Sequence, residues 1–140
     1  MKKAALGIGI LALDQILKYL ALKNLLPQLG GFLTYICNPS ISWGISVKGI
    51  LFWLLWIISI LAVLRIASKS SWNIYLVAVI AGSLSNLADR IFHGCVIDYI
   101  HISNHFPIFN LADMMITGGI ILFLLSTSLS LSKKSNQLVD

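Results

Sequence analysis

Four long apolar runs alternate with polar connections along the chain, at residues 4–22, 50–67, 73–88 and 111–131. A helix that crosses a bilayer needs about 20 mostly apolar residues, so each run is expected to form one membrane-spanning helix. The connection between the second and third runs covers only residues 68–72, which makes those two helices antiparallel neighbours. The pattern therefore predicts an all-α integral membrane protein with four transmembrane helices, built as a single membrane-embedded domain over residues 1–140.

The two longer connections, residues 23–49 and 89–110, differ from the spans in composition. Residues 32–36 and 95–100 are rich in β-branched and aromatic side chains, which fit strands better than helices. We therefore expect a short strand in each connection.

The overall composition also indicates a membrane location. Hydrophobic residues make up 58% of the chain and charged residues 11%, whereas a soluble domain carries about 25% charged residues. The formal net charge is +5, and the basic residues lie mostly at the ends of apolar runs, as topology signals and headgroup contacts do. Nucleic acid is therefore not expected as a partner. The N-terminus resembles the start of a signal peptide, but no small-residue cleavage site follows, so an uncleaved first span is predicted.

Lysine and arginine counts predict the orientation, because cytoplasmic loops are enriched in these residues. With the N-terminus inside, the cytoplasmic segments hold six of them (Lys2, Lys3, Arg65, Lys69, Lys133 and Lys134) and the outer segments hold three (Lys23, Lys48 and Arg90). Both termini are therefore expected in the cytoplasm, and both longer connections at the outer face.

On this topology the polar residues of the spans and loops gather in the outer half of the bilayer or just above it. Carboxylates and amides are costly at membrane depth and usually serve a function there. The composition does not require them to converge, so their convergence is the physical argument for a site. The residues are Asp14, Asn38, Asn86, Asp89, Arg90, Asp98, Asn110 and Asp113.

Asp98 and Asp113 are the candidates for chemistry. Asp98 lies on a strand-like segment and Asp113 on the opening turn of a helix, so a hairpin-like return could bring them together. Two close carboxyl groups cannot both ionise, and they then share one proton. Such a pair can activate water and polarise a carbonyl, which is the chemistry of an aspartic peptidase. The alternatives are a helix-capping role for Asp113, together with Asn110, and a solvated loop position for Asp98.

The spacing of the remaining polar residues indicates structural roles for them. Asp14 and Lys18 are spaced as an i,i+4 ion pair packed inward. Asn86, Asp89 and Arg90 share one helix face, on which we expect Arg90 to neutralise Asp89 and Asn86 to bond across helices. Ala78 and Gly82 continue that face and would allow a neighbouring helix to approach closely. Asn38 could act as a turn residue alone.

The cysteines and histidines do not indicate a metal site. Cys37 and Cys95 have no CxxC spacing; they are either a disulfide in an oxidising compartment or two separate thiols, and the sequence favours separate thiols. His93, His101 and His105 have no carboxylate in register and are interpreted as interface residues.

Five motifs in order resemble those of the bacterial lipoprotein signal peptidases, the signal peptidase II family. They are Asp14-Gln15-x-x-Lys18, residues 38–44 (NPSISWG), residues 81–90 (AGSLSNLADR), residues 94–99 (GCVIDY) and residues 107–113 (PIFNLAD). The chain departs from the family pattern at Pro39-Ser40, Trp43, Ala81 and Ser85, and it is short for the family. These departures bear on loop conformation and substrate preference.

The resemblance implies four transmembrane helices with a small β-sheet cradle and a short helix on the outer face. It implies that Asp98 and Asp113 are catalytic, and that six residues support them or touch substrate: Asn38, Asn86, Arg90, Asn110, Asp14 and Asp89. No cofactor is expected. The expected substrate is a prolipoprotein that carries diacylglycerol on a cysteine and is cut just before that cysteine. Membrane lipid and the inhibitor globomycin are expected partners of a monomer in the bacterial inner membrane, with the site at its outer face.

Two other functions fit parts of the sequence. An ion- or proton-conducting protein could use Asp14 and Asp89 as relay groups, although the inner halves of the second and fourth spans offer almost no polar residues. A structural subunit of a larger complex would show no activity alone.

Overall fold

The computed structural model describes residues 2–27, 31–40, 49–70 and 73–136. Four helices dominate it: α1 (Lys2–Leu22), α2 (Ile50–Ser70), α3 (Ile74–His93) and α4 (Leu111–Asn136). By length and composition, α1, α3 and the Leu111–Ser130 part of α4 could each cross a membrane, while the apolar stretch of α2 is shorter, Trp53–Ser68. Many leucine and isoleucine side chains on these helices face outward, as expected where lipid replaces water. The predicted four-helix membrane fold is confirmed.

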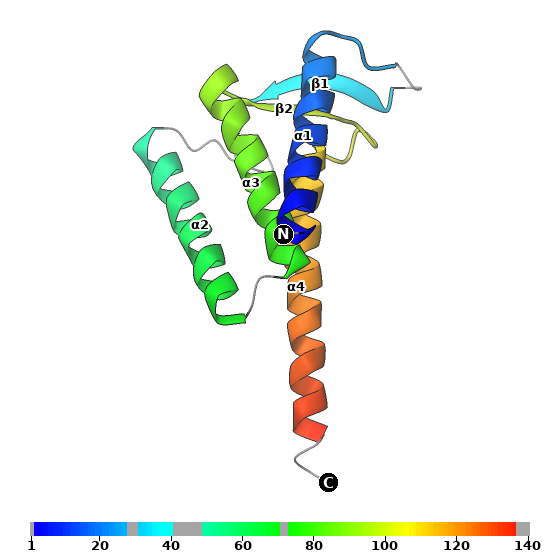
Figure 1. Cartoon of the computed structure of the whole chain (residues 1–140). Helices are drawn as coiled ribbons and strands as arrows, with labels where there is room; N and C mark the ends of the chain where they lie inside the picture. Colours follow the sequence, from blue (N-terminus) through cyan, green and yellow to red (C-terminus); the bar gives the residue numbers. More distant parts are fainter. Residues whose placement is uncertain (1, 28–30, 41–48, 71–72, 137–140) are drawn as a thin grey trace.

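Helix α3 occupies the centre of the bundle and contacts the other three helices (Figure 1). It approaches α4 closely because two glycines leave room. A Cβ added to Gly82 would lie 2.5 Å from the carbonyl oxygen of Ala112, and one added to Gly119 would lie 2.7 Å from that of Tyr75. The expected close approach at Gly82 is therefore present, and it places the start of α4 against the middle of α3.

Defined caps end α3 on both sides. At its start the Asn73 side chain accepts a hydrogen bond from the Leu76 amide, and at its end Gly94 adopts the left-handed conformation at φ 75°. Glycine takes this conformation without a Cβ penalty. The helix therefore continues to His93, five residues past the predicted end at residue 88, and the connection begins at Gly94 rather than at Asp89.

Two antiparallel strands, β1 (Leu33–Asn38) and β2 (Val96–Ile100), lie across one end of the helices (Figure 1). The pairs Ile36–Asp98, Cys37–Ile97 and Asn38–Val96 set their register, with an irregularity nearer Leu33. The beginning of α1 and the last turns of α4 both point away from this sheet. The expected small sheet is confirmed; no short outer helix lies in the described ranges, and residues 41–48 fall outside them.

The sheet rests on a small core formed by side chains of α1, of β2 and of Cys95, which directly precedes β2. Ala21, Cys95, Ile97 and Tyr99 are buried together beneath it. Every residue of β2 from Val96 to Tyr99 is buried, whereas β1 is mostly half-buried or exposed. Asp98 is thus carried on the better-protected strand.

Candidate active site

A buried ion cluster lies directly beneath the sheet. The Lys18 ammonium is 2.9 Å from Asp14 and 2.7 Å from Asp89, and it donates a third bond of 2.8 Å to the Asn86 side-chain oxygen. An ammonium has three N–H donors, so all three have partners. These partners come from α1 and α3, and the cluster therefore joins the two helices.

Asp14 extends this cluster to two further elements. Its carboxylate accepts hydrogen bonds from the Ser85 hydroxyl at 2.6 Å, the Tyr99 hydroxyl at 3.0 Å and the Ala112 amide at 3.2 Å. The donors lie on α3, β2 and α4. A single carboxylate on α1 thus connects α1 to α3, to strand β2 and to the start of α4.

Asp89 fixes strand β2 in a similar way. One carboxylate oxygen accepts the Ile97 backbone amide at 3.0 Å, and the other accepts the Gln15 side chain at 3.1 Å. Because Ile97 precedes Asp98 in the chain, this bond holds the backbone next to the candidate catalytic residue.

Above the cluster lies a pocket with a cavity volume of about 130 Å³, and Asp98 and Asp113 both line it. The strand β2 supplies Asp98 and the first turn of α4 supplies Asp113. The other lining residues come from the end of β1 and from α2, α3 and β2: Asn38, Ser40, Trp56, Ser83, Asn86, Leu87, Arg90 and Val96.

Two asparagine amides hold the Asp98 carboxylate, one on each oxygen. Asn38 donates at 2.8 Å and Asn110 donates at 2.7 Å. Burial raises the pKa of Asp98 to about 6, against the lowering effect of the Asn38 and Asn110 hydrogen bonds. A carboxyl group with this pKa exchanges its proton near neutral pH, as a general acid or base must.

A third asparagine holds Asp113. The Asn86 side chain donates to one carboxylate oxygen at 2.7 Å, and the backbone amide of Asn110 donates to the other at 3.4 Å. In return the Asn110 side-chain oxygen accepts the Asp113 amide at 2.9 Å. This is the capping arrangement expected from the sequence, and it leaves the Asp113 carboxylate on the pocket. Capping and a place in the pocket therefore occur together.

Each of these three asparagines is oriented by a donor on its carbonyl side. The oxygen of Asn38 accepts the Ser40 amide at 2.9 Å, that of Asn86 accepts Lys18, and that of Asn110 accepts the Asp113 amide. The amide groups cannot turn around without losing these bonds. Their N–H donors consequently face the two pocket carboxylates.

Two sequence-based interpretations need correction. The cation in direct contact with Asp89 is Lys18, at 2.7 Å. Arg90 attracts Asp89 through its charge, and its guanidinium donates hydrogen bonds to the carbonyl oxygens of Ser40 at 2.6 Å and Pro39 at 3.3 Å. The cysteines are not separate thiols, because Cys37 and Cys95 form a disulfide. Both corrections concern contacts between segments 50 to 71 positions apart in the sequence.

The sequence interpretation also missed three side chains. Ser85 and Tyr99 hold Asp14, and Trp56 of α2 lines the pocket. Only the alternation along β2 offered a signal, since Tyr99 follows Asp98 and must point to the opposite face. Within the described ranges no cluster of three His, Cys, Asp or Glu side chains is arranged to hold a metal ion.

Comparison with known proteins agrees with the motif resemblance. A family model described as signal peptidase (SPase) II matches residues 6–129. A lipoprotein signal peptidase of Thermodesulfovibrio yellowstonii is 38% identical, over 81% of this chain and 86% of that protein. A lipoprotein signal peptidase of Moorella thermoacetica is 34% identical, over 84% of this chain and 86% of its own.

Two solved structures, both described as a bacterial membrane enzyme obtained by the in meso method, share the fold. The first has a TM-score of 0.82 at 28% identity and covers 95% of this chain and 91% of its own. The second has a TM-score of 0.76 at 27% identity and covers 90% of this chain and 92% of its own.

Proposed function

The chain belongs to the signal peptidase II family, and from that premise we propose that Asp98 and Asp113 are its catalytic pair. Membership makes the protein a multi-pass membrane protease that removes signal peptides from prolipoproteins. The single observation that carries the assignment is the shared pocket: both carboxylates line it, and asparagine amides hold both.

Hydrolysis at such a pair needs one carboxylate and one carboxylic acid. The carboxylate takes a proton from water, and the water oxygen bonds to the scissile carbonyl carbon. The carboxylic acid gives its proton to the carbonyl oxygen, which forms a neutral tetrahedral intermediate. When the carbon–nitrogen bond breaks, the amine leaves with the proton that the first carboxyl group took from water. One hydroxyl of the intermediate gives its proton to the other carboxylate as the carbonyl re-forms, so the pair returns to its starting state. The proton affinities belong to the pair rather than to one residue.

The supporting residues have distinct places in this proposal. Asn38, Asn86 and Asn110 hold the carboxylates, and Arg90 holds the backbone that follows β1. Asp14 and Asp89 act at a distance, through the ion cluster beneath the sheet.

The family resemblance implies the substrate, and a pocket at the membrane surface would suit it. A diacylglyceryl cysteine would stay among the lipids while the preceding peptide bond enters the pocket, so the cut would fall just before the lipidated cysteine. We place the pocket at the outer face of the bacterial inner membrane with both termini in the cytoplasm, following the lysine and arginine distribution. The protein would act as a monomer, and globomycin would bind in the pocket.

The test is cleavage of a prolipoprotein carrying a diacylglyceryl cysteine by the purified protein in lipid nanodiscs. Mass spectrometry should find the lipidated cysteine as the new N-terminus, and globomycin should block the reaction. Asp98→Asn and Asp113→Asn should each lower kcat by about 100- to 10,000-fold, the contribution expected of a proton-transfer group.

Asp140→Asn makes the same chemical change elsewhere in the sequence and serves as the matched control. EDTA and serine reagents should have no effect. Near-wild-type cleavage by either pocket variant would remove the assignment of the pair. Proton flux through proteoliposomes that is lost in Asp14→Asn would favour the ion-conducting alternative.

A further inference from the structure

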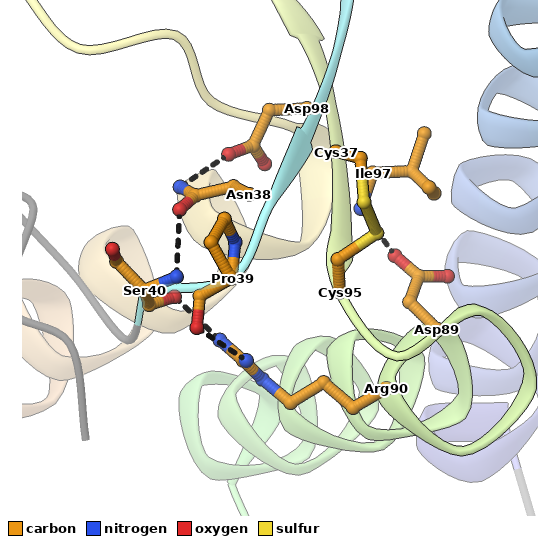
Figure 2. Close-up of a disulfide and its surroundings, with 9 residues drawn as sticks. All are labelled: Cys37, Asn38, Pro39, Ser40, Asp89, Arg90, Cys95, Ile97 and Asp98. Atoms are coloured by element: carbon orange, nitrogen blue, oxygen red, sulfur yellow. Dashed lines mark hydrogen bonds between the residues drawn. A yellow bond between two sulfur atoms is a disulfide. The ribbon is translucent and has the colours of Figure 1, made fainter. Parts of the chain in front are cut away.

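A disulfide joins the two strands of the sheet next to the pocket (Figure 2). Cys37 of β1 and Cys95, which directly precedes β2, are 58 residues apart in sequence, and their Cα atoms are 5.5 Å apart. Cys95 is buried in the core beneath the sheet, whereas Cys37 lies on the exposed strand. The bond therefore connects a well-packed part of the molecule to a poorly packed one.

Strand β2 does not need the disulfide to hold its position. The Ile97 amide donates to Asp89, the Ile97 carbonyl accepts Asn110, and the Tyr99 hydroxyl donates to Asp14. Tyr99 and Ile100 also bond to the Phe109 backbone. These contacts come from α1, α3 and the segment before α4, so the position of Asp98 is determined from several sides.

Strand β1 has fewer contacts. Among the described residues it pairs with β2 alone, because the sheet has two strands, and its register is irregular between Leu33 and Ile36. At its end, Arg90 binds the Pro39 and Ser40 carbonyl groups. Its last residue, Asn38, is nevertheless one of the two amides that hold the Asp98 carboxylate.

The position of Cys37 gives the disulfide its effect on Asn38. Successive side chains of a strand point to opposite faces, so Cys37 points to Cys95 while Asn38 points to Asp98, as Figure 2 shows. The bond can therefore hold the end of β1 without entering the pocket.

We propose that the Cys37–Cys95 disulfide is a positioning element of the peptidase site, which keeps the Asn38 amide on the Asp98 carboxylate. This proposal rests on the proposed catalytic role of Asp98. Its consequence is that full activity requires the oxidised protein, so the sheet must face a compartment in which disulfides persist. An outer-face pocket meets that requirement, and a cytoplasmic pocket does not.

Formation of the bond is a thiol–disulfide exchange. The two cysteine thiols give up two electrons and two protons to an oxidised dithiol carrier, whose own disulfide becomes two thiols. Dithiothreitol reverses the step: it becomes a cyclic disulfide and returns two electrons and two protons to the cysteine sulfurs. Since Cys37 lies on the exposed strand, the reductant can reach it in the folded protein.

The test compares the wild type with the Cys37→Ser/Cys95→Ser double variant, using the diacylated substrate in nanodiscs. The double variant should lower kcat about 10- to 100-fold with little change in KM, as expected for loss of one hydrogen bond to a charged group. Dithiothreitol should do the same to the wild type and have no effect on the double variant, which is the matched control.

A pH profile separates positioning from general stability. The Asn38 amide stabilises the charged carboxylate and lowers the pKa of Asp98. Its loss should therefore raise that pKa and move the acidic limb of activity to higher pH. The other charged groups acting on Asp98 are Asp113, Lys18 and Arg90, and the cysteine substitutions change none of them.

The decisive comparison combines the cysteine variant with Asn38→Ala. If the disulfide acts through Asn38, removing both should reduce activity no more than Asn38→Ala alone, a non-additive result expected of coupled sites. Additive losses, an unshifted pH profile or full activity of the reduced wild type would overturn the proposal. Two free thiols in protein purified from its native membrane, counted by maleimide mass labelling before and after reduction, would overturn it as well.

Reduction of the folded wild type keeps the test informative if the double variant does not fold. Failure of this proposal is also distinct from failure of the proposed function. If Asp98→Asn retains cleavage, the catalytic role proposed for the pair is wrong. If Asp98→Asn loses cleavage but the reduced wild type keeps it, only the proposed role of the disulfide is wrong.

Discussion

The four aspartates near the sheet divide into two pairs that share a residue type and differ in environment. Asp14 and Asp89 are buried, and both contact the Lys18 ammonium directly. Asp98 is almost as buried, at 2% exposure, but its hydrogen bonds come from neutral amides, and Asp113 lies beside it on the same pocket. One pair lies within the protein between helices, and the other lines a cavity that substrate could enter.

The difference shows how the environment of an aspartate decides whether it stabilises the fold or takes part in the chemistry. A carboxylate in contact with a buried ammonium ties together the helices that carry the two groups, because removing either partner leaves the other charge buried and unpaired. A carboxylate held by amides alone keeps access to both protonation states. The Lys18 cluster is therefore suited to fix the helices, and the pocket pair is suited to move protons.

Removing the cation should produce the largest loss of stability. Lys18→Met keeps the length of the side chain but leaves Asp14 and Asp89 without their shared partner. Breaking a buried ion pair from one side costs about 3–5 kcal/mol, and the free energy of unfolding in detergent should fall by that amount. Lys23→Met, which removes an exposed ammonium 5.8 Å from the Tyr19 ring, is the control. An equal effect of the two substitutions would mean that the cluster does not hold the helices.

Asn86 joins the two regions, because its oxygen accepts Lys18 and its amide donates to Asp113. Asn86→Ala should reduce kcat by about 10- to 100-fold, the loss expected for one hydrogen bond to a charged group. Asn104→Ala, in the exposed connection before α4, makes the same substitution outside the pocket. Unchanged cleavage in Asn86→Ala would show that the cluster does not act on Asp113.

The smallest expected effect belongs to the hydroxyl that links the cluster to the sheet. The Tyr99 hydroxyl donates to Asp14 and accepts the Leu111 amide at 3.2 Å. Tyr99→Phe should lower the free energy of unfolding by about 1–3 kcal/mol, the cost of leaving buried polar groups unpaired. Thermal unfolding beside Tyr35→Phe, on exposed β1, measures it. No difference between the two variants would contradict this role for Tyr99.

Local patterns predicted much of this structure. The i,i+4 spacing gave the ion pair between Asp14 and Lys18, and β-branched runs gave the strands. Capping rules gave the bonds between Asn110 and Asp113. The family motifs contain every residue that lines the pocket except Trp56. The ion pair and the cap were predictable because their residues are close in sequence. The strands were predictable because each is a run of β-branched and aromatic residues.

The contacts that escaped prediction join distant segments. Lys18 reaches Asp89, 71 positions away, only because α1 packs against α3. Arg90 lies beside Asp89 in sequence but reaches across to β1, and the disulfide depends on the register of the two strands. Sequence spacing carries no information on such packing, so the partner of a charged residue could be named only once the helices and strands were placed.

The measurement that most directly tests this division compares the four variants Asp14→Asn, Asp89→Asn, Asp98→Asn and Asp113→Asn for cleavage and unfolding. We expect the first two to lower the free energy of unfolding by about 3–5 kcal/mol and to retain measurable cleavage in the fraction that stays folded. The last two should remain as stable as the wild type and lose cleavage by about 100- to 10,000-fold. Cleavage that falls in proportion to stability across all four variants would contradict the account.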